Sequence, residues 1–184
     1  ELPGIEAEFQ PLDLRRREVI LLGSAGQRII TAGEILCLAG LTAGLNSTQK
    51  NEYNITVLRG PSISELILSP EEIDYTGIET PDVIIALDQE GVDRRRDVFG
   101  ELDDRSLILQ AAGVEIPACN AHVHHMDLKS QNIKKPDRAL AALGVLAKIG
   151  QIISPEMLET ALAIRFKDKI LESSLELVRG VEAG

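Results

Sequence analysis

Two uninterrupted apolar runs of strand length stand out in the hydrophobic pattern of this chain, Val19–Leu22 and Val83–Leu87. Neither run alternates between apolar and polar positions, which is typical of parallel strands that helices cover on both faces. The polar stretch Asn46–Asn54 interrupts this pattern. Shorter apolar segments predict further strands, at Ile55–Leu58, Ile63–Leu68, Ser106–Gln110 and His122–His125.

Helix-like segments alternate with these strands. Ile29–Leu45 carries a single charge, Glu34, and predicts a buried helix over residues 31–43. Residues 138–149 are rich in Ala and Leu and predict a second buried helix, whereas the highly charged segment Gln89–Phe99 predicts an exposed one. Alternation of strands and helices favours an α/β fold: a mainly parallel sheet with helices on both faces, in a Rossmann-like three-layer arrangement.

The ends of the chain have their own signals. Ser154 as N-cap and Pro155 at the first helical position predict a helix start, and Gly180 suits a C-terminal cap. Residues 1–18 predict an N-terminal tail whose Arg15–Arg17 form a solvated lead-in. Residues 19–184 then form a single α/β domain.

The loop Gly23–Arg28 joins the first apolar run to the first helix. Backbone N–H groups in such a loop, together with the positive end of the helix dipole, can hold an anion. The loop lacks the third glycine of GxGxxG and the Lys-Ser/Thr of a Walker loop, which disfavours a private NAD or ATP site. The alternative is that its glycines only permit a tight turn.

Arg59 lies in a second glycine-containing loop, Leu58-Arg59-Gly60-Pro61, between two segments predicted as strands. An arginine held in such a loop can clamp a carboxylate or phosphate, or it can simply pair with a nearby surface acid. If both loops follow strands, they lie at the same edge of the sheet, where α/β domains bind their ligands. The candidate binding residues are Gly23, Ser24, Gly26, Gln27, Arg28, Arg59 and Gly60.

No residue is identified as catalytic, because the sequence offers no nucleophile–base order and no paired carboxylates at a meaningful spacing. His122 and His124 share one face of their predicted strand and His125 lies on the other, which favours a core or interface role over zinc binding. The two cysteines, Cys37 and Cys119, are too few for an iron–sulfur cluster, which usually needs four thiolates.

Composition limits the partners and the location. The formal net charge of −10 argues against nucleic acid or an anionic membrane as the partner. The longest uncharged stretch, Ile35–Gln49, is shorter than the ~20 residues that span a bilayer, and no signal peptide is visible. With only two isolated cysteines, a reduced, cytoplasmic protein is expected.

Short motifs along the chain, none of them specific alone, carry a family resemblance through their order and spacing. They are loop residues Gly23, Gly26 and Gln27, helix residues Ala32, Gly33 and Leu36, the pairs Arg59-Gly60 and Ser69-Pro70, strand residues Pro81, Asp82, Ile85, Ala86 and Leu87, and the segment Leu140–Leu162. In this order they resemble the gamma subunit of the 2-oxoacid:ferredoxin oxidoreductases, which include the pyruvate and 2-oxoglutarate enzymes. The resemblance covers Val19–Gly180.

Several positions depart from that family pattern. Ala25 and Arg28 stand where glycines are common in the family loop, and Pro61 replaces a second glycine after Arg59-Gly60. These departures indicate an outlying branch, so the resemblance does not assign the 2-oxo acid.

The resemblance implies a division of labour within a larger enzyme. The whole enzyme decarboxylates a 2-oxo acid on thiamine diphosphate, transfers the acyl group to coenzyme A and reduces ferredoxin through iron–sulfur clusters. It implies that this chain binds neither thiamine diphosphate nor a cluster, and that these belong to the alpha and beta subunits. Whether the enzyme also has a delta subunit stays open. The isolated chain is then inactive, and its dimerisation stays open. The alternative is a free-standing Rossmann-like nucleotide-binding oxidoreductase or a regulatory module.

Overall fold

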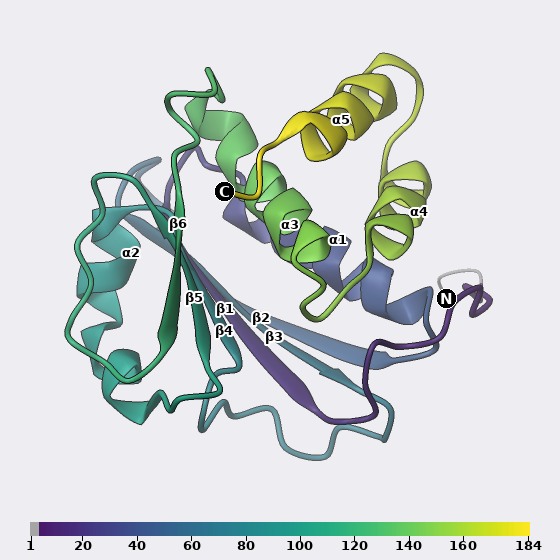
Figure 1. Ribbon diagram of the computed structural model, residues 1–184, viewed down its shortest axis with the longest axis horizontal. Coiled ribbons are helices and arrows are strands. Elements are labelled where there is room, and N and C mark those ends of the chain that lie inside the picture. The colour runs from purple at the N-terminus through teal and green to yellow at the C-terminus, as the bar shows by residue number, and fades with distance from the viewer. Residues whose placement is uncertain (1–3) are drawn as a thin grey trace.

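A computed structural model describes residues 4–184, and its centre is a six-stranded sheet in the order β2-β3-β1-β4-β5-β6. β1, β4, β5 and β6 are parallel neighbours, whereas β3 runs antiparallel to both β1 and β2 (Figure 1). The predicted mainly parallel sheet is therefore confirmed. The strands are β1 (Arg17–Ser24), β2 (Asn46–Tyr53), β3 (Pro61–Ser69), β4 (Val83–Ala86), β5 (Leu107–Ala111) and β6 (His122–Met126).

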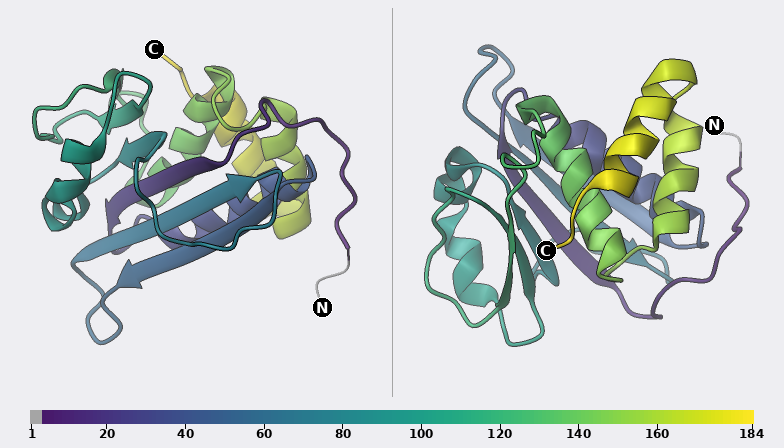
Figure 2. Two further views of the ribbon diagram at one scale, coloured as in Figure 1. Left: turned by 90° about the horizontal axis from the view of Figure 1, so that it is seen from below. Right: turned by 45° about the horizontal axis from the view of Figure 1, so that its top comes forward.

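Helices cover both faces of the sheet, which confirms the predicted α/β architecture. On one face lie α1 (Ile29–Leu41) and α3 (Arg138–Lys148), and α4 (Pro155–Arg165) and α5 (Asp168–Gly180) pack on them from outside (Figures 1 and 2). The other face carries the short helix α2 (Gln89–Arg94), which is followed by a 3-10 helix, η1 (Arg96–Glu101). A second 3-10 helix, η2 (Lys135–Asp137), directly precedes α3. Among residues 4–184, no helix is long and apolar enough to cross a membrane.

The core follows from the two long apolar runs. Val19–Leu22 in β1 and Val83–Ala86 in β4 are fully buried, because helices cover both of their faces. α1 and α3 are buried along most of their length, as their sequences predict. The α2–η1 segment is less exposed than predicted, since Val92 and Phe99 enter the core.

The predicted start of α4 and the predicted end of α5 have different outcomes. The Ser154 hydroxyl accepts a hydrogen bond of 3.2 Å from the Met157 N–H, so the predicted N-cap of α4 is confirmed. α5 ends differently from the prediction, because Gly180 is its last helical residue and the extended Val181 follows as C-cap.

The region after α1 contains one strand that was not predicted and lacks one that was. The polar stretch from Asn46 forms β2, an edge strand that pairs along its whole length with β3. Ile55–Leu58, predicted as a strand, instead lies in the exposed connection between β2 and β3. Because backbone hydrogen bonds hold an edge strand, a polar sequence can form one, whereas an apolar run beyond the last paired residue has no neighbour to bind.

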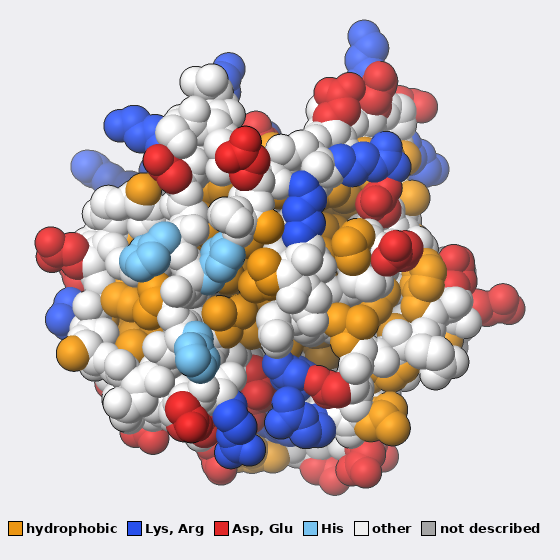
Figure 3. All heavy atoms as spheres, viewed as in Figure 1, with side chains coloured by type: hydrophobic (Ala, Val, Ile, Leu, Met, Phe, Trp, Pro, Cys, Tyr) orange, Lys and Arg blue, Asp and Glu red, His pale blue; other side chains and the backbone are white. Residues whose placement is uncertain are grey.

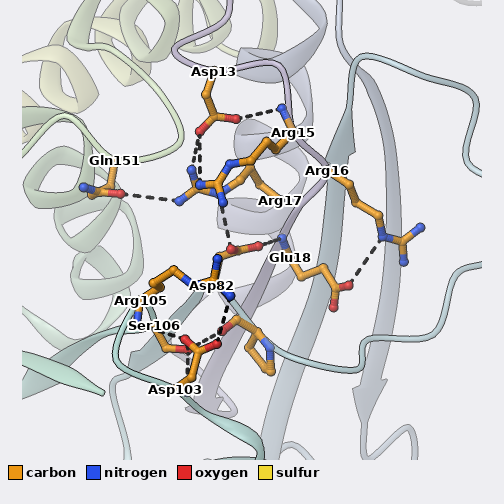
Figure 4. A network of polar contacts seen from close by, with 11 residues as sticks. Asp13, Arg15, Arg16, Arg17, Glu18, Asp82, Asp103, Arg105, Ser106 and Gln151 are labelled. Carbon is orange, nitrogen blue, oxygen red and sulfur yellow. Dashed lines mark hydrogen bonds and ion pairs between the residues drawn. The ribbon is translucent and has the colours of Figure 1, made fainter. Parts of the chain in front are cut away.

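Of the arginines predicted to form a solvated lead-in, Arg15 is exposed as expected, whereas Arg16 and Arg17 make structural contacts (Figure 4). Asp82 Oδ2 accepts a hydrogen bond of 2.7 Å from the Glu18 N–H, and Asp82 Oδ1 lies 3.5 Å from the Arg17 Nε. Arg17 also pairs with Asp13. Arg16 donates hydrogen bonds of 2.7 and 3.0 Å to the carbonyl oxygens of Tyr75 and Gly77. The network ties the residues before β1 to the amino-terminal edge of the sheet.

Candidate functional site

The loop between β1 and α1 has the backbone geometry of a tight turn. Gly26 has φ of 89°, and Arg28, the residue before α1, is left-handed with φ of 56°. No side chain caps the start of α1, and no acidic residue lies in its first turn. Among the described residues, the positive end of the helix dipole therefore faces the loop with neither a side-chain cap nor an acidic residue in its first turn.

Gln27 fixes the shape of this loop from inside. Its side chain is 1% exposed, its Oε1 accepts a hydrogen bond of 3.0 Å from the Ser24 N–H, and its Nε2 donates one of 3.4 Å to the Leu87 carbonyl. The Ser24 hydroxyl is also buried, and it has no hydrogen-bond partner among the described residues. Gln27 thus links the carboxyl ends of β1 and β4, and its amide is not turned toward solvent.

The second predicted loop lies beside the first. The Ala25 N–H donates a hydrogen bond of 3.0 Å to the Gly60 carbonyl oxygen, and Gly60 has φ of 100°. The reason for this closeness differs from the sequence argument, because Arg59 precedes β3 and does not follow a strand at Ile55–Leu58. Since β3 runs antiparallel to β1, its first residues lie at the carboxyl end of β1.

A third basic residue, which the sequence did not indicate, lies at this edge. The Cε of Lys135 in η2 lies 4.0 Å from the position that a Cβ on Gly26 would occupy. Lys135, Arg28 and Arg59 are all exposed. An acidic group is also near, because Glu90 Oε2 lies 4.0 Å from the position that a Cβ on Gly60 would occupy. The only signal in the sequence was the pair Lys134-Lys135 ahead of a buried helix, and nothing local connects that pair to Gly26.

A groove of about 730 Å³ opens beside Arg28, between α1, α3 and α5. Apolar side chains from the helices, including those of Ile35, Leu140 and Phe166, form part of its wall. Arg165 lies over the Phe166 ring at 5.2 Å from its centroid and contacts Glu34 at 3.4 Å. The groove thus combines apolar surface with charged groups of both signs, and Arg28 belongs both to the groove and to the loop.

The three histidines lie in β6, the edge strand at the other end of the sheet from β2. The register pairs His122 with Leu107 and His124 with Leu109, so His122 and His124 lie on one face of the sheet and His125 on the other. Figure 3 shows the imidazoles spread over one side of the molecule with apolar side chains between them. Within residues 4–184, no three side chains of the His, Cys, Asp or Glu type come together in a way that could hold a metal ion.

Chemically, the edge formed by the two loops supplies binding groups: backbone N–H groups, two guanidinium groups and one ammonium group. These groups suit a phosphate or carboxylate, since charge-assisted hydrogen bonds from such donors are strong. Loop Gly23–Arg28, loop Arg59–Gly60 and Lys135 are hereafter the candidate anion site.

Residues 18–182 match the model of a protein family described as pyruvate ferredoxin/flavodoxin oxidoreductase. The chain is 31% identical over 153 residues to 2-oxoglutarate synthase subunit KorC of Methanocaldococcus jannaschii, and the match covers 80% of this chain and 82% of that protein.

Two solved structures share the fold. The gamma subunit of a keto/oxoacid ferredoxin oxidoreductase from Geobacter sulfurreducens superposes with a TM-score of 0.68 at 23% identity, over 90% of this chain and 98% of that subunit. A 2-oxoglutarate:ferredoxin oxidoreductase from Magnetococcus marinus gives a TM-score of 0.74 at 18% identity. That match covers 94% of this chain but 32% of the longer chain.

Proposed function

Because the chain belongs to the pyruvate ferredoxin/flavodoxin oxidoreductase family, we propose that it is the gamma subunit of a 2-oxoacid:ferredoxin oxidoreductase. The assembled enzyme would convert a 2-oxo acid and coenzyme A to acyl-coenzyme A and carbon dioxide, and pass two electrons to ferredoxin. The observation that carries this proposal is the match to subunit KorC over about four fifths of both chains. It supports the role of that subunit, with 2-oxoglutarate as the first substrate to test.

The redox and carbon chemistry is assigned to partner subunits. An iron–sulfur cluster needs about four thiolates, and this chain has two cysteines. Cys37 lies in α1 with its thiol directed at the Thr48 carbonyl, 3.8 Å away. These residues do not fit a cluster, so clusters and thiamine diphosphate would lie on the alpha, beta or delta subunits, with ferredoxin reached through them.

This chain's own contribution would be to bind coenzyme A at the candidate anion site. The exposed Gly26, the positive end of α1, and the side chains of Arg28, Arg59 and Lys135 would hold phosphate groups. Ser24, Gln27 and Gly60 would maintain the shape of the two loops, because they bind one another or Ala25 and Leu87. Gly23 would leave room for Gln27, since a Cβ at Gly23 would lie 2.7 Å from the Gln27 Oε1. The partly apolar groove beside Arg28 suits the uncharged parts of the same molecule.

Co-expression with the candidate alpha, beta and delta subunits tests the proposal. We expect the chain to co-purify with them, and the assembled enzyme to reduce ferredoxin or a viologen dye only when both a 2-oxo acid and coenzyme A are present. The isolated chain serves as the control and should show no turnover. Failure of the chain to assemble, or dye reduction by the chain alone, would contradict the proposed function.

A further inference from the structure

The connection between β2 and β3, residues Asn54–Gly60, exposes a group of large aliphatic side chains; it is called the hairpin tip below. Ile55 is 83% exposed, Val57 40% and Leu58 96%. Figure 2 shows this connection projecting beyond the ends of its two strands. Burial of Leu and Ile side chains is favourable, so the tip leaves hydrophobic free energy unused in the isolated chain.

The base of the hairpin tip is firmly attached to the body of the protein. The Gly60 carbonyl accepts the hydrogen bond from Ala25, and Glu52 at the end of β2 forms an ion pair of 2.6 Å with Arg94 in α2. Within the tip, the Asn54 side-chain oxygen accepts hydrogen bonds of 3.2 and 3.1 Å from the N–H and hydroxyl of Thr56. These contacts hold the aliphatic side chains out in solution and reduce the entropy cost of their binding to a partner.

The tip also differs from the rest of the surface in charge. Residues 54–60 contain no acidic side chain and one basic side chain, Arg59, although the whole chain has a net charge of −10. Two copies of such an acidic protein repel one another, which disfavours a second copy as the partner. The tip therefore suits an apolar pocket on the surface of another protein.

The hairpin tip lies at the same sheet edge as the candidate anion site, through the Ala25–Gly60 hydrogen bond. In the Magnetococcus marinus chain, the part that matches this protein is 32% of the length, so there the same fold is joined to further domains. In a separate subunit, an equivalent neighbour has to be held by non-covalent contacts. Exposed aliphatic side chains on a preorganised loop are well suited to such contacts.

We propose that the hairpin tip inserts Ile55 and Leu58 into an apolar pocket of a partner subunit, and that this subunit closes over the candidate anion site. The inference rests on the proposed function, because it takes the partner from the same enzyme. Arg59, within the tip, would then lie between the two subunits.

The test compares Ile55→Ser/Leu58→Ser with Leu14→Ser, which changes a leucine that is 77% exposed outside the tip. The dissociation constant of each chain for the remaining assembled subunits is measured by titration of a fluorescently labelled chain. We expect a dissociation constant about tenfold larger or more for the double variant, wild-type affinity for Leu14→Ser, and the same melting temperature for all three chains.

Each other outcome has a distinct meaning. Equal affinities for wild type and double variant overturn the inference and leave the proposed function intact. If the double variant instead abolishes a dimer of the isolated chain while still joining the other subunits normally, the occupant is a second copy and the inference is overturned. A wild-type chain that does not bind the other subunits overturns the proposed function, and this inference with it.

Discussion

The backbone of Gly91 in α2 lies against the backbone of Gly23 near the end of β1. A Cβ atom on Gly91 would be 2.5 Å from the Gly23 nitrogen and 2.6 Å from the Leu22 carbonyl carbon. Backbone atoms cannot move aside as the end of a side chain can. The absence of a side chain at Gly91 is what lets α2 pack this closely on the sheet, and this contact supports the loop that begins at Gly23.

Gly91→Ala should therefore destabilise the protein, although alanine is the better helix former. We expect a loss of about 2–4 kcal/mol in the free energy of unfolding, measured by urea denaturation. Gly100→Ala is the matched control, because a Cβ there meets nothing within 4 Å. An equal effect of the two substitutions would contradict the packing argument.

Asp82 should contribute to stability mainly as a hydrogen-bond acceptor. Asp82→Ala leaves the Glu18 N–H without its acceptor and removes one of the two carboxylates that pair with Arg17, so it should cost about 1–3 kcal/mol in the free energy of unfolding. Asp82→Asn keeps an oxygen that can accept from Glu18 and loses only the ion pair, so its cost should be about 1 kcal/mol or less. Thermal unfolding of both variants measures the difference, and a larger loss for Asp82→Asn would refute this assignment.

Cys37 should react slowly with thiol reagents in the folded protein. Burial, which disfavours the thiolate, raises the pKa of Cys37 from 9.0 to about 11. Below pH 9 this shift lowers the thiolate fraction about 100-fold. Because only the thiolate reacts, the labelling rate should fall by the same factor. In Cys119→Ser, iodoacetamide labelling followed by mass spectrometry should show that slow rate, rising with pH up to about 11. Labelling in urea is the control, and equal rates in folded and unfolded protein would contradict burial as the cause.

Loss of the basic residues at the candidate anion site should weaken coenzyme A binding in the assembled enzyme. For Arg59→Ala and Lys135→Ala we expect the apparent Michaelis constant for coenzyme A to rise about tenfold, which corresponds to about 1.4 kcal/mol of binding free energy. The Michaelis constant for the 2-oxo acid should stay unchanged. Lys134→Ala, which removes an adjacent exposed lysine, is the charge-matched control. An unchanged value for Arg59→Ala would leave that residue an ordinary structural arginine.

The core strands and the main helices could be predicted from the sequence because the apolar residues within each segment indicate that it is buried. Val83–Leu87 is apolar at every position, and only a strand or helix buried on all sides accommodates such a run. The same applies to the Ala- and Leu-rich α3 and to the Ser154-Pro155 start of α4, where the capping side chain is local. The β1–α1 loop could be identified for the same reason, since its glycines and its neighbours are contiguous.

The tertiary structure alone decided the features that depend on partners distant in sequence. β2 is polar and forms because its backbone pairs with β3, while the apolar Ile55–Leu58 has no strand beside it and remains a loop. Lys135 reaches Gly26, and Gly60 binds Ala25, only because the antiparallel direction of β3 and the place of η2 before α3 bring these segments to one edge. Side-chain patterns record whether a segment is buried, whereas strand direction and long-range contacts follow from the pairing of the backbone across the whole sheet.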